Sequence, residues 1–270
     1  MLMLPNIDFL NPWLVAIALN AVLLAIAFVA PKKLLTPAGL LHGWLLGVLI
    51  WGTLSWQGYV VVLFYFLVGS GVTRIGMDIK EAEGIAEKRS GARGPENVWG
   101  SAFTAALCAL LVLVVPISCF NFVEICADRE LVNDIVRLLL LGYVASFSTK
   151  LSDTCASEVG KAYGKRTFLI TTLQPVARGT EGAISLEGTL AGVVGSAAIA
   201  LLGWGVGLID SLGVLWCLLA AFIATNIESV IGATLQAKYI YLTNELVNVI
   251  NTFIGAIAAL MFALLWRWLI

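Results

Sequence analysis

Long apolar runs separated by short polar segments dominate the hydrophobic pattern of this chain. About 20 helical residues, each rising about 1.5 Å, cross a hydrocarbon core about 30 Å thick. Eight apolar runs reach or approach this length: residues 12–30, 38–55, 57–73, 99–118, 133–149, 188–208, 211–232 and 246–268. We therefore expect residues 1–270 to form a single all-α integral membrane domain, a polytopic bundle of about eight transmembrane helices.

Composition supports this interpretation. The chain has 270 residues, of which 60% are hydrophobic and only 12% are charged, whereas about 25% of residues are charged in a typical soluble protein. Two boundaries are weakly marked: Asp134 and Arg137 interrupt the start of the fifth run, and only a short turn at Trp56–Gly58 separates the second run from the third. The composition excludes an ordinary soluble domain.

The basic residues are distributed unequally between the two sets of loops. One side carries Lys32, Lys33, Arg74, Lys80, Lys88, Arg89, Arg93, Lys150, Lys161, Lys165, Arg166, Arg178 and Lys238. The other side has Arg129, Arg137 and Arg267. Because lysine and arginine accumulate in cytoplasmic loops, we predict that the basic side faces the cytoplasm and that both termini face the opposite side.

Most of the acidic residues lie on the same predicted cytoplasmic face. They fall in the loops 74–98, 150–187 and 233–245, with Glu228 at an adjoining helix end. Transporters commonly place their polar groups near the bilayer midplane. A site assembled from several helix ends on one face instead favours an enzyme that uses a water-soluble substrate.

The segment 146–160, SFSTKLSDTCASEVG, places Asp153 and Glu158 where the fifth apolar run ends. A charged side chain at the centre of a membrane span costs about 2.5 to 3.5 kcal/mol on insertion scales, so it usually faces a cavity, an ion or a substrate. Five helical positions separate the two carboxylates by about 140°. Either the helix unwinds near Gly160 or Glu158 serves a different ligand. Magnesium suits such oxygen ligands; alternatively, Asp153 pairs with Lys150 or a neighbouring arginine.

Residues 71–100 are predicted to form a short charged helix followed by a glycine-rich loop, SGARGPEN. Gly91 and Gly94 allow backbone amides to approach an anion, and Lys88, Arg89 and Arg93 add positive charge. The alternative is a basic cluster that contacts anionic lipid head groups. That alternative does not explain the glycines.

Residues 160–192 form a long predicted loop with hydroxyl, glycine and basic side chains. Lys161, Lys165, Arg166 and Arg178 can neutralise phosphate oxygens, and Thr180 lies between two glycines. The β-branched segment TFLITTL predicts a strand-like excursion. The loop contains no GxxxxGK[ST] motif and is therefore not a P-loop.

Two polar stripes lie on the seventh and eighth predicted helices. Their members are Thr225, Glu228, Ser229, Gly232 and Gln236 on one helix and Asn244, Asn248, Asn251 and Gly255 on the other. Asparagines in membrane helices commonly form hydrogen bonds between helices, and that interpretation stays open. Glu228, at the helix end, is a second candidate metal ligand.

Several ordered motifs resemble one family of integral membrane proteins. They are GARGPENVWGS, SDTCASEVGKAYGKR, TTLQPVARGTEGAISLEGTLAG, TNIESVIGATLQ and NELVNVINTFIGA, within residues 39–260. The family includes plant and cyanobacterial phytyl-phosphate kinases and the animal transmembrane protein 19. By motif, the resemblance implies functional roles for Arg93, Asn97, Asp153, Ser157, Glu158, Thr180, Glu228, Gln236, Asn244 and Asn248.

The resemblance implies an isoprenoid-monophosphate kinase that uses a nucleoside triphosphate, with CTP as the expected donor. Arg93, Asp153 and Glu158 are the expected catalytic residues, and Asp153, Glu158 and Glu228 the expected Mg²⁺ ligands. Phosphoryl transfer needs positioning and charge stabilisation more than covalent chemistry from the protein. The alternatives are a CTP-dependent cytidylyltransferase that makes a CDP-lipid, and a non-enzymatic transporter or flippase of an isoprenoid phosphate.

The expected partners are a lipid phosphate in the bilayer and a nucleotide from the cytoplasm. We expect no nucleic-acid partner and leave a homo-oligomer open. In a cyanobacterial cell the expected location is the plasma or thylakoid membrane.

Overall fold

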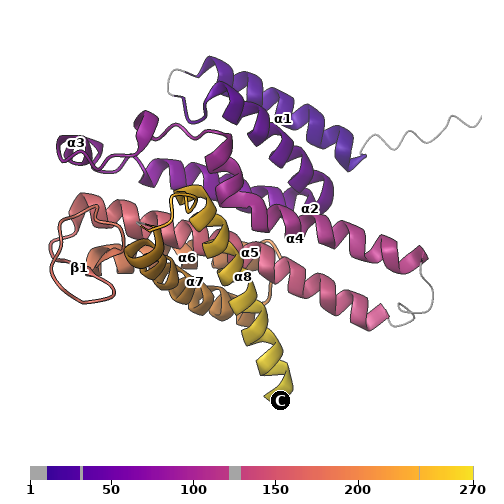
Figure 1. The fold of residues 1–270 in the computed structure, drawn as a ribbon. Helices are drawn as coiled ribbons and strands as arrows, with labels where there is room; N and C mark the ends of the chain where they lie inside the picture. Colours follow the sequence, from indigo (N-terminus) through magenta and orange to yellow (C-terminus); the bar gives the residue numbers. More distant parts are fainter. Residues whose placement is uncertain (1–10, 31–32, 122–128, 237, 270) are drawn as a thin grey trace, which may run out of the picture.

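The fold is a bundle of long helices (Figure 1) in a computed structural model that describes residues 11–30, 33–121, 129–236 and 238–269. The elements are α1 (Pro12–Val29), α2 (Pro37–Val72), α3 (Met77–Ala82), a 3₁₀ turn (Lys88–Gly91), α4 (Pro95–Asn121), α5 (Arg129–Tyr163), β1 (Thr167–Leu169), β2 (Ala183–Ser185), α6 (Leu186–Gly205), α7 (Ser211–Ile231), a π-helical turn (Gly232–Gln236) and α8 (Asn244–Leu269). Among the described residues, seven helices are long and apolar enough to cross a membrane. The predicted all-α membrane architecture is confirmed.

Helix α2 accounts for both the second and the third predicted span. Its backbone leaves the helical conformation at Ser55, where φ is 55° and ψ is −156°. Arg93 contacts the segment just before α2 and the second half of α2: its amide donates to the Leu34 carbonyl (3.0 Å) and its guanidinium to the Tyr65 hydroxyl (2.9 Å). In a straight helix Leu34 and Tyr65 would lie about 46 Å apart. The chain therefore folds back at Ser55, just before the predicted turn, and α2 supplies two spans.

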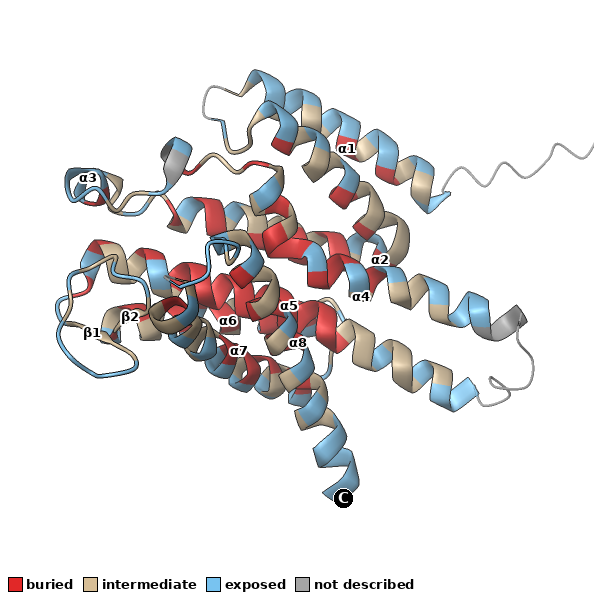
Figure 2. Ribbon diagram, viewed as in Figure 1, coloured by how far each residue is buried: buried red, intermediate tan, exposed pale blue. Residues whose placement is uncertain are grey.

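Helix α5 occupies the centre of the bundle, where it contacts α2, α4, α6, α7 and α8. Every position from Leu141 to Cys155 is buried, and Figure 2 shows this run along the middle of α5. The helix continues to Tyr163, well beyond residue 149, where we expected the span to end. The prediction ended it too early because neighbouring helices, rather than apolar side chains, bury its polar part.

Two glycines let α6 pack closely on the polar part of α5. A Cβ atom on Gly188 would lie 2.5 Å from the Ala156 carbonyl oxygen, and one on Gly192 would lie 3.1 Å from the Ser152 carbonyl oxygen. These distances are shorter than ordinary van der Waals contact. The helix that carries Asp153 therefore has its neighbour at backbone distance.

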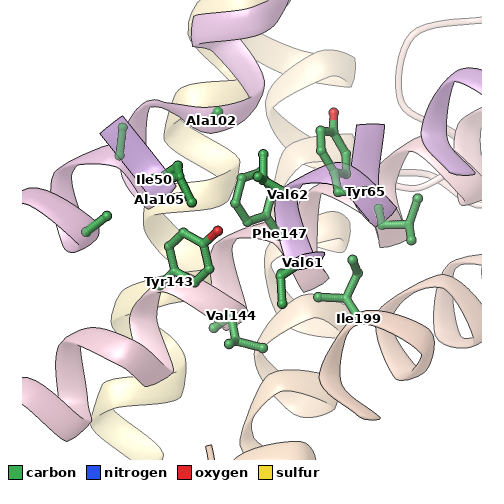
Figure 3. Packing of buried hydrophobic residues seen from close by; sticks show 14 of the residues in the cluster. Ile50, Val61, Val62, Tyr65, Ala102, Ala105, Tyr143, Val144, Phe147 and Ile199 are labelled. Carbon is green, nitrogen blue, oxygen red and sulfur yellow. The ribbon is translucent and has the colours of Figure 1, made fainter. Parts of the chain in front are cut away.

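An aromatic cluster joins α5 to the second half of α2 (Figure 3). Phe147 lies between Tyr143 and Tyr65, with ring centroids 5.3 Å and 5.2 Å away. The Tyr143 hydroxyl donates to the Gly58 carbonyl at 2.7 Å, so this buried polar group is satisfied. The cluster fixes α5 against the second half of α2.

The polar connections gather at one end of the bundle, near α3 and β1, while the described end of α8 lies away from them (Figure 1). Strands β1 and β2 pair antiparallel, with Thr167 opposite Ser185 and Leu169 opposite Ala183. The strand-like excursion expected in TFLITTL is confirmed. The membrane-spanning part thus carries its irregular structure at one end, as expected in lipid, where exposed backbone groups cannot be hydrated.

Candidate functional site

A cavity of about 510 Å³ lies at the polar end of the bundle, between α4, α5, α6, α7, α8 and the loops before α4 and β2. Thirteen of the predicted site residues line it: Arg89, Gly91, Arg93, Asn97, Lys150, Asp153, Ser157, Glu158, Lys161, Thr180, Glu228, Asn244 and Asn248. They come from five separate parts of the chain. The structure therefore brings most of the candidate residues to one place.

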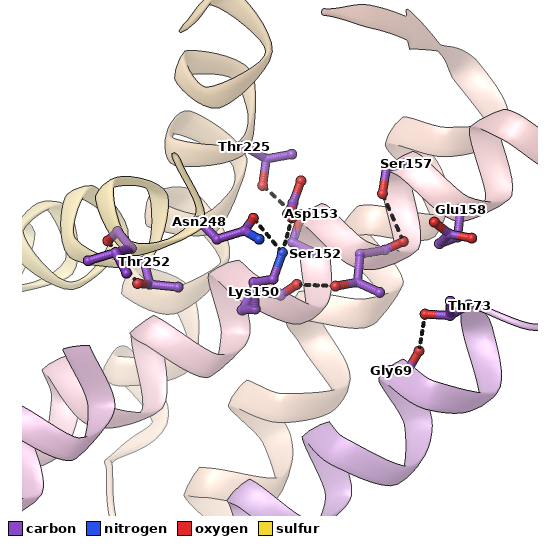
Figure 4. Close-up of polar contacts among 12 residues, drawn as sticks. Gly69, Thr73, Lys150, Ser152, Asp153, Ser157, Glu158, Thr225, Asn248 and Thr252 are labelled. Carbon is purple, nitrogen blue, oxygen red and sulfur yellow. Dashed lines mark hydrogen bonds and ion pairs between the residues drawn. The ribbon is translucent and has the colours of Figure 1, made fainter. Parts of the chain in front are cut away.

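Lys150, Asp153 and Asn248 form a polar cluster where α5 meets α8 (Figure 4). The Lys150 ammonium donates to the Asp153 carboxylate and, at 2.7 Å, to the Asn248 side-chain oxygen. The Lys150 and Asp153 side chains are only 8% and 10% exposed. The pairing of Asp153 with Lys150, left open by the sequence, is present, and it also holds Asn248 of the predicted asparagine row.

Glu158 points to a different side of α5 and forms a buried ion pair with Lys80 of α3. Lys161 lies 3.6 Å from the other Glu158 carboxylate oxygen. Because α5 stays helical to Tyr163, Asp153 and Glu158 keep the wide angular separation expected from their spacing. Of the two possibilities stated above, the structure has the one in which Glu158 serves a different partner.

Glu228, at the end of α7, faces the same cavity as Asp153. The charges of Asp153, Lys150, Glu181 and Lys161 all act on its carboxylate. Among the described residues no basic side chain forms a salt bridge with it. On the inner side of α7, the Thr225 hydroxyl contacts the Ser152 hydroxyl at 3.4 Å. In the described part of the chain Glu228 is thus a cavity carboxylate near two lysines but in a salt bridge with neither.

The cavity wall holds more acidic than basic side chains. Its basic members are Arg89, Arg93, Lys150 and Lys161, and its acidic members are Glu87, Asp153, Glu158, Glu181, Glu228 and Glu245. An anionic phosphate ligand in such a place requires an accompanying cation. The wall therefore suits a metal–phosphate complex better than a free phosphate.

The oxygen donors around Asp153 and Glu228 fit Mg²⁺, which takes carboxylate and water oxygens and usually binds through one or two carboxylates plus substrate phosphates. Within the described ranges no group of three His, Cys, Asp or Glu side chains is arranged to hold a metal ion. A cage made of protein ligands alone is therefore absent from that part of the chain. A two-carboxylate site completed by phosphate oxygens remains compatible with the geometry.

The glycine-rich loop before α4 covers one side of the cavity. The Asn97 side-chain oxygen accepts hydrogen bonds from the Gly94 amide (3.0 Å) and the Arg89 guanidinium (3.1 Å), and Arg89 also pairs with Glu96. Gly91 has φ of 76°, a conformation that glycine adopts readily. Asn97 thus caps α4 and holds Arg89 over the cavity.

Arg93 is held by aromatic residues in the second half of α2. Its guanidinium carbon lies 5.2 Å from the centre of the Tyr65 ring and 5.9 Å from that of Phe66. Contacts of this kind are attractive because the ring face is electron-rich. The sequence did not identify Tyr65, because it lies in the middle of the predicted span 57–73 and far from Arg93 in the chain.

The N-terminal ends of three helices reach the cavity: Asn97 and Ser101 of α4, Gly188 of α6 and Asn244 of α8 line it. Helix N-termini carry partial positive charge and unpaired amides, which favour anions. Alternate spans of the bundle begin at this end. The fold therefore adds neutral donors that favour anions to the charged side chains.

The remaining candidates lie elsewhere. Lys165 and Arg166 border a separate hollow with Pro175 and Val176, and Arg178 pairs with Glu83 and donates to the Ala162 carbonyl (3.1 Å). The structure does not bring these three into the main cavity. Gln236 donates to Asn244, and the Gly94 amide donates to the Asn97 side chain at the start of α4. The side chain of Lys88 lies outside the described part of the structure.

Sequence reasoning missed several residues of the site. Lys80 was counted only among the basic loop residues, yet it is fully buried and donates to the Thr73 carbonyl (2.7 Å) as well as to Glu158. Ser101, Ser152 and Glu181 also line the cavity. Ser152 lies in the segment 146–160, whose polar side chains indicated a site. No local pattern indicated that Lys80 is buried, because its partner Glu158 is far away in the sequence.

Comparison with known proteins places this chain among membrane proteins. The family described as "Integral membrane protein DUF92" matches residues 20–256. A Synechocystis protein named "Uncharacterized membrane protein sll0875" is 65% identical over 92% of this chain and 90% of its own length. The "Protein VTE6, chloroplastic" of Arabidopsis thaliana is 41% identical over 92% of this chain and 71% of its own.

A more distant relative is archaeal. The "Uncharacterized membrane protein MJ0933" of Methanocaldococcus jannaschii is 31% identical over 84% of each chain. No solved structure matches this chain.

Proposed function

This chain belongs to the integral membrane protein DUF92 family, and we propose that it is a lipid-phosphate kinase. The proposed reaction transfers a phosphoryl group from a nucleoside triphosphate, with CTP as the expected donor, to an isoprenoid monophosphate such as phytyl phosphate. The motif resemblance to phytyl-phosphate kinases and the 41% identity to the plant relative support this substrate class. The product is the isoprenoid diphosphate.

One structural observation carries the proposal. Asp153 and Glu228 line one cavity at the polar end of the bundle. The side chains of Lys150, Arg89 and Arg93 line the same cavity. Phosphoryl transfer requires this combination of metal-binding oxygens and positive groups. The position allows a water-soluble nucleotide and a membrane-embedded lipid to meet.

Asp153 and Glu228 are the residues that would hold Mg²⁺. When bound, Mg²⁺ neutralises phosphate charge and orients the phosphates for in-line transfer. Lys150, now held by Asp153 and Asn248, lies beside these carboxylates and is placed to bind a phosphate oxygen. Glu158 has a positioning role, since its pair with Lys80 fixes the loop that carries Arg89 and Arg93.

The acceptor in this reaction is already an anionic phosphate, so no strong base is required to activate it. The principal obstacle is repulsion between acceptor and donor phosphates. Lys150, Lys161, Arg89 and Arg93 reduce this repulsion, and the α4, α6 and α8 N-termini add amide donors. A site without histidine is adequate for this chemistry.

The α4 and α8 side of the cavity favours an enzyme over a transporter. On these two helices the lining ends at Ser101 and at Asn248. One turn deeper, the Thr104 and Thr252 hydroxyls bond to each other at 2.9 Å across the helix interface. These two hydroxyls are therefore used for packing between α4 and α8, whereas a transporter needs a path that continues across the membrane.

The test is an assay of purified protein with phytyl, geranylgeranyl and farnesyl phosphates, Mg²⁺ and each labelled nucleoside triphosphate. Nucleoside diphosphate plus lipid diphosphate supports the kinase. Release of pyrophosphate with a nucleotide-linked lipid would identify a cytidylyltransferase instead. Lipid translocation across liposomes without nucleotide, and without either product, would identify a transporter.

A further inference from the structure

The cavity extends from the polar end down between α6 and α7. On α6 it is lined by Gly188, Thr189, Gly192, Val193 and Ser196, and on α7 by Phe222, Thr225, Asn226, Glu228 and Ser229. At 1.5 Å per residue, Ser196 lies about 15 Å from the start of α6 and Phe222 about 14 Å from the end of α7. These depths are about half of a hydrocarbon core about 30 Å thick.

The deep part of the cavity reaches the outer surface of the bundle. Val193 is 42% exposed and Phe222 is 49% exposed, and both also line the cavity. Both residues lie well inside helices that meet the length and hydropathy requirements for spanning a membrane. We therefore expect part of the surface that they expose to face lipid, which gives the cavity an edge open to the bilayer between α6 and α7.

The chemistry of the wall changes along this direction. The charged members of the lining come from α5, α7, α8 and the segments before α4 and β2, and the α6 wall contributes none. The Ser196 hydroxyl donates to the Val193 carbonyl at 2.9 Å, and the Ser196 carbonyl accepts from the Ser148 hydroxyl at 3.1 Å. The deep wall is thus uncharged, and its serine is satisfied within the protein.

Two glycines of α6 border the cavity where α6 packs on α5. Gly188 and Gly192 have no side chain between α5 and α6, and both are buried cavity-lining positions. We name the uncharged trough lined by Gly188, Gly192, Val193, Ser196, Phe222 and Thr225 the α6–α7 groove. It connects the carboxylates of Asp153 and Glu228 to the lipid phase.

We infer that the α6–α7 groove binds the isoprenoid tail of a lipid monophosphate while the phosphate lies beside Asp153, Glu228 and Lys150. The headgroup part of this inference rests on the proposed function. The cavity matches such an amphiphile because it is charged at the polar end of the bundle, and the α6–α7 groove below is uncharged and open laterally to lipid. The substrate therefore enters from the bilayer between α6 and α7, and its tail stays partly in lipid.

The test uses full-length protein in phospholipid nanodiscs and a geranylgeranyl phosphate that carries a diazirine near the phosphate end of its tail. We call a cross-link competed if excess unmodified geranylgeranyl phosphate abolishes it. After irradiation, peptide mapping should place competed cross-links on residues 188–196 and 222–229. Cross-links elsewhere, or groove cross-links that are not competed and that a diazirine phospholipid reproduces equally, would overturn the inference.

Matched variants sharpen this test. Val193→Trp fills the groove, whereas Val194→Trp places the same side chain on the neighbouring lipid-facing position, which is 69% exposed and does not line the cavity. The tryptophan side chain leaves less room for the lipid tail in the groove. Val193→Trp should therefore lower competed labelling roughly tenfold. Phe222→Trp and its neighbour Ile223→Trp form a second pair. Equal labelling within both pairs would contradict the groove.

The cross-linking needs no nucleotide, so the groove and the kinase reaction are tested separately. Competed labelling of the groove in a protein that forms no lipid diphosphate would retain the groove and reject the proposed reaction. Kinase activity with an unchanged KM for lipid phosphate in Val193→Trp and Phe222→Trp, together with labelling elsewhere, would retain the reaction and reject the groove.

Discussion

Lys80 on α3 and Glu158 on α5 form an ion pair whose side chains are 0% and 3% exposed. The Lys80 ammonium also donates to the Thr73 carbonyl, at the end of α2. Three segments are thereby joined at one buried point. The loop that leads to Arg89 and Arg93 starts from this anchor, so its position over the cavity depends on a contact outside the reacting groups.

Replacing Lys80 with methionine should destabilise the protein strongly, because it leaves the Glu158 carboxylate buried with only the more distant Lys161. Breaking a buried ion pair by removing one partner costs about 3 to 5 kcal/mol. Thermal unfolding of the purified protein in one detergent measures the effect. The double variant Lys80→Met, Glu158→Gln should recover part of the loss; a single variant as stable as the parent protein would contradict the anchor.

Asp153→Asn should abolish most of the proposed kinase activity while the fold is kept, because asparagine still accepts a hydrogen bond from Lys150 but binds Mg²⁺ poorly. We expect a loss of at least about 100-fold in kcat. Asp134→Asn is the matched control on the same helix, since Asp134 is 40% exposed and pairs with Arg137 and Arg267. Full activity in a folded Asp153→Asn protein would remove Asp153 from the metal site.

Glu228→Gln should raise the Mg²⁺ concentration needed for half-maximal activity, because it removes a cavity carboxylate that has no salt-bridge partner among the described residues. A shift of about 10- to 100-fold is expected for a weakened metal site. Activity measured across a Mg²⁺ titration gives the value. Glu187→Gln, in the first turn of α6 and outside the cavity lining, should leave the titration unchanged. An identical curve for Glu228→Gln would exclude Glu228 as a ligand.

Ser55→Gly should stabilise the protein by about 1 kcal/mol, because Ser55 has a positive φ of 55° with ψ of −156°, a region essentially reserved for glycine. Ser55→Val should destabilise it, since a β-branched side chain tolerates this backbone less well. Melting temperatures of the three proteins measure the order. A glycine variant less stable than the serine protein would show that the Ser55 side chain contributes to the turn.

The membrane spans follow directly from the sequence, because lipid requires about 20 apolar residues for each crossing helix. The expected span 12–30 is seen as Pro12–Val29, and 211–232 as Ser211–Ile231. The exception is α5. Its polar second half is helical and buried because other helices surround it, and no local pattern records how many neighbours a helix has.

The sequence by itself also identified Asp153 and Glu158 and, from helical spacing alone, their different directions. Tertiary structure decided their partners, because Lys80 and Asn248 lie far from them in the chain. It also decided which basic residues share the cavity: Lys150 and Arg93 do, and Arg178 does not. The cytoplasmic orientation and the Mg²⁺ site stay predictions. Local composition determines which groups reach the polar end of a bundle; only the packing of distant helices determines which of them meet.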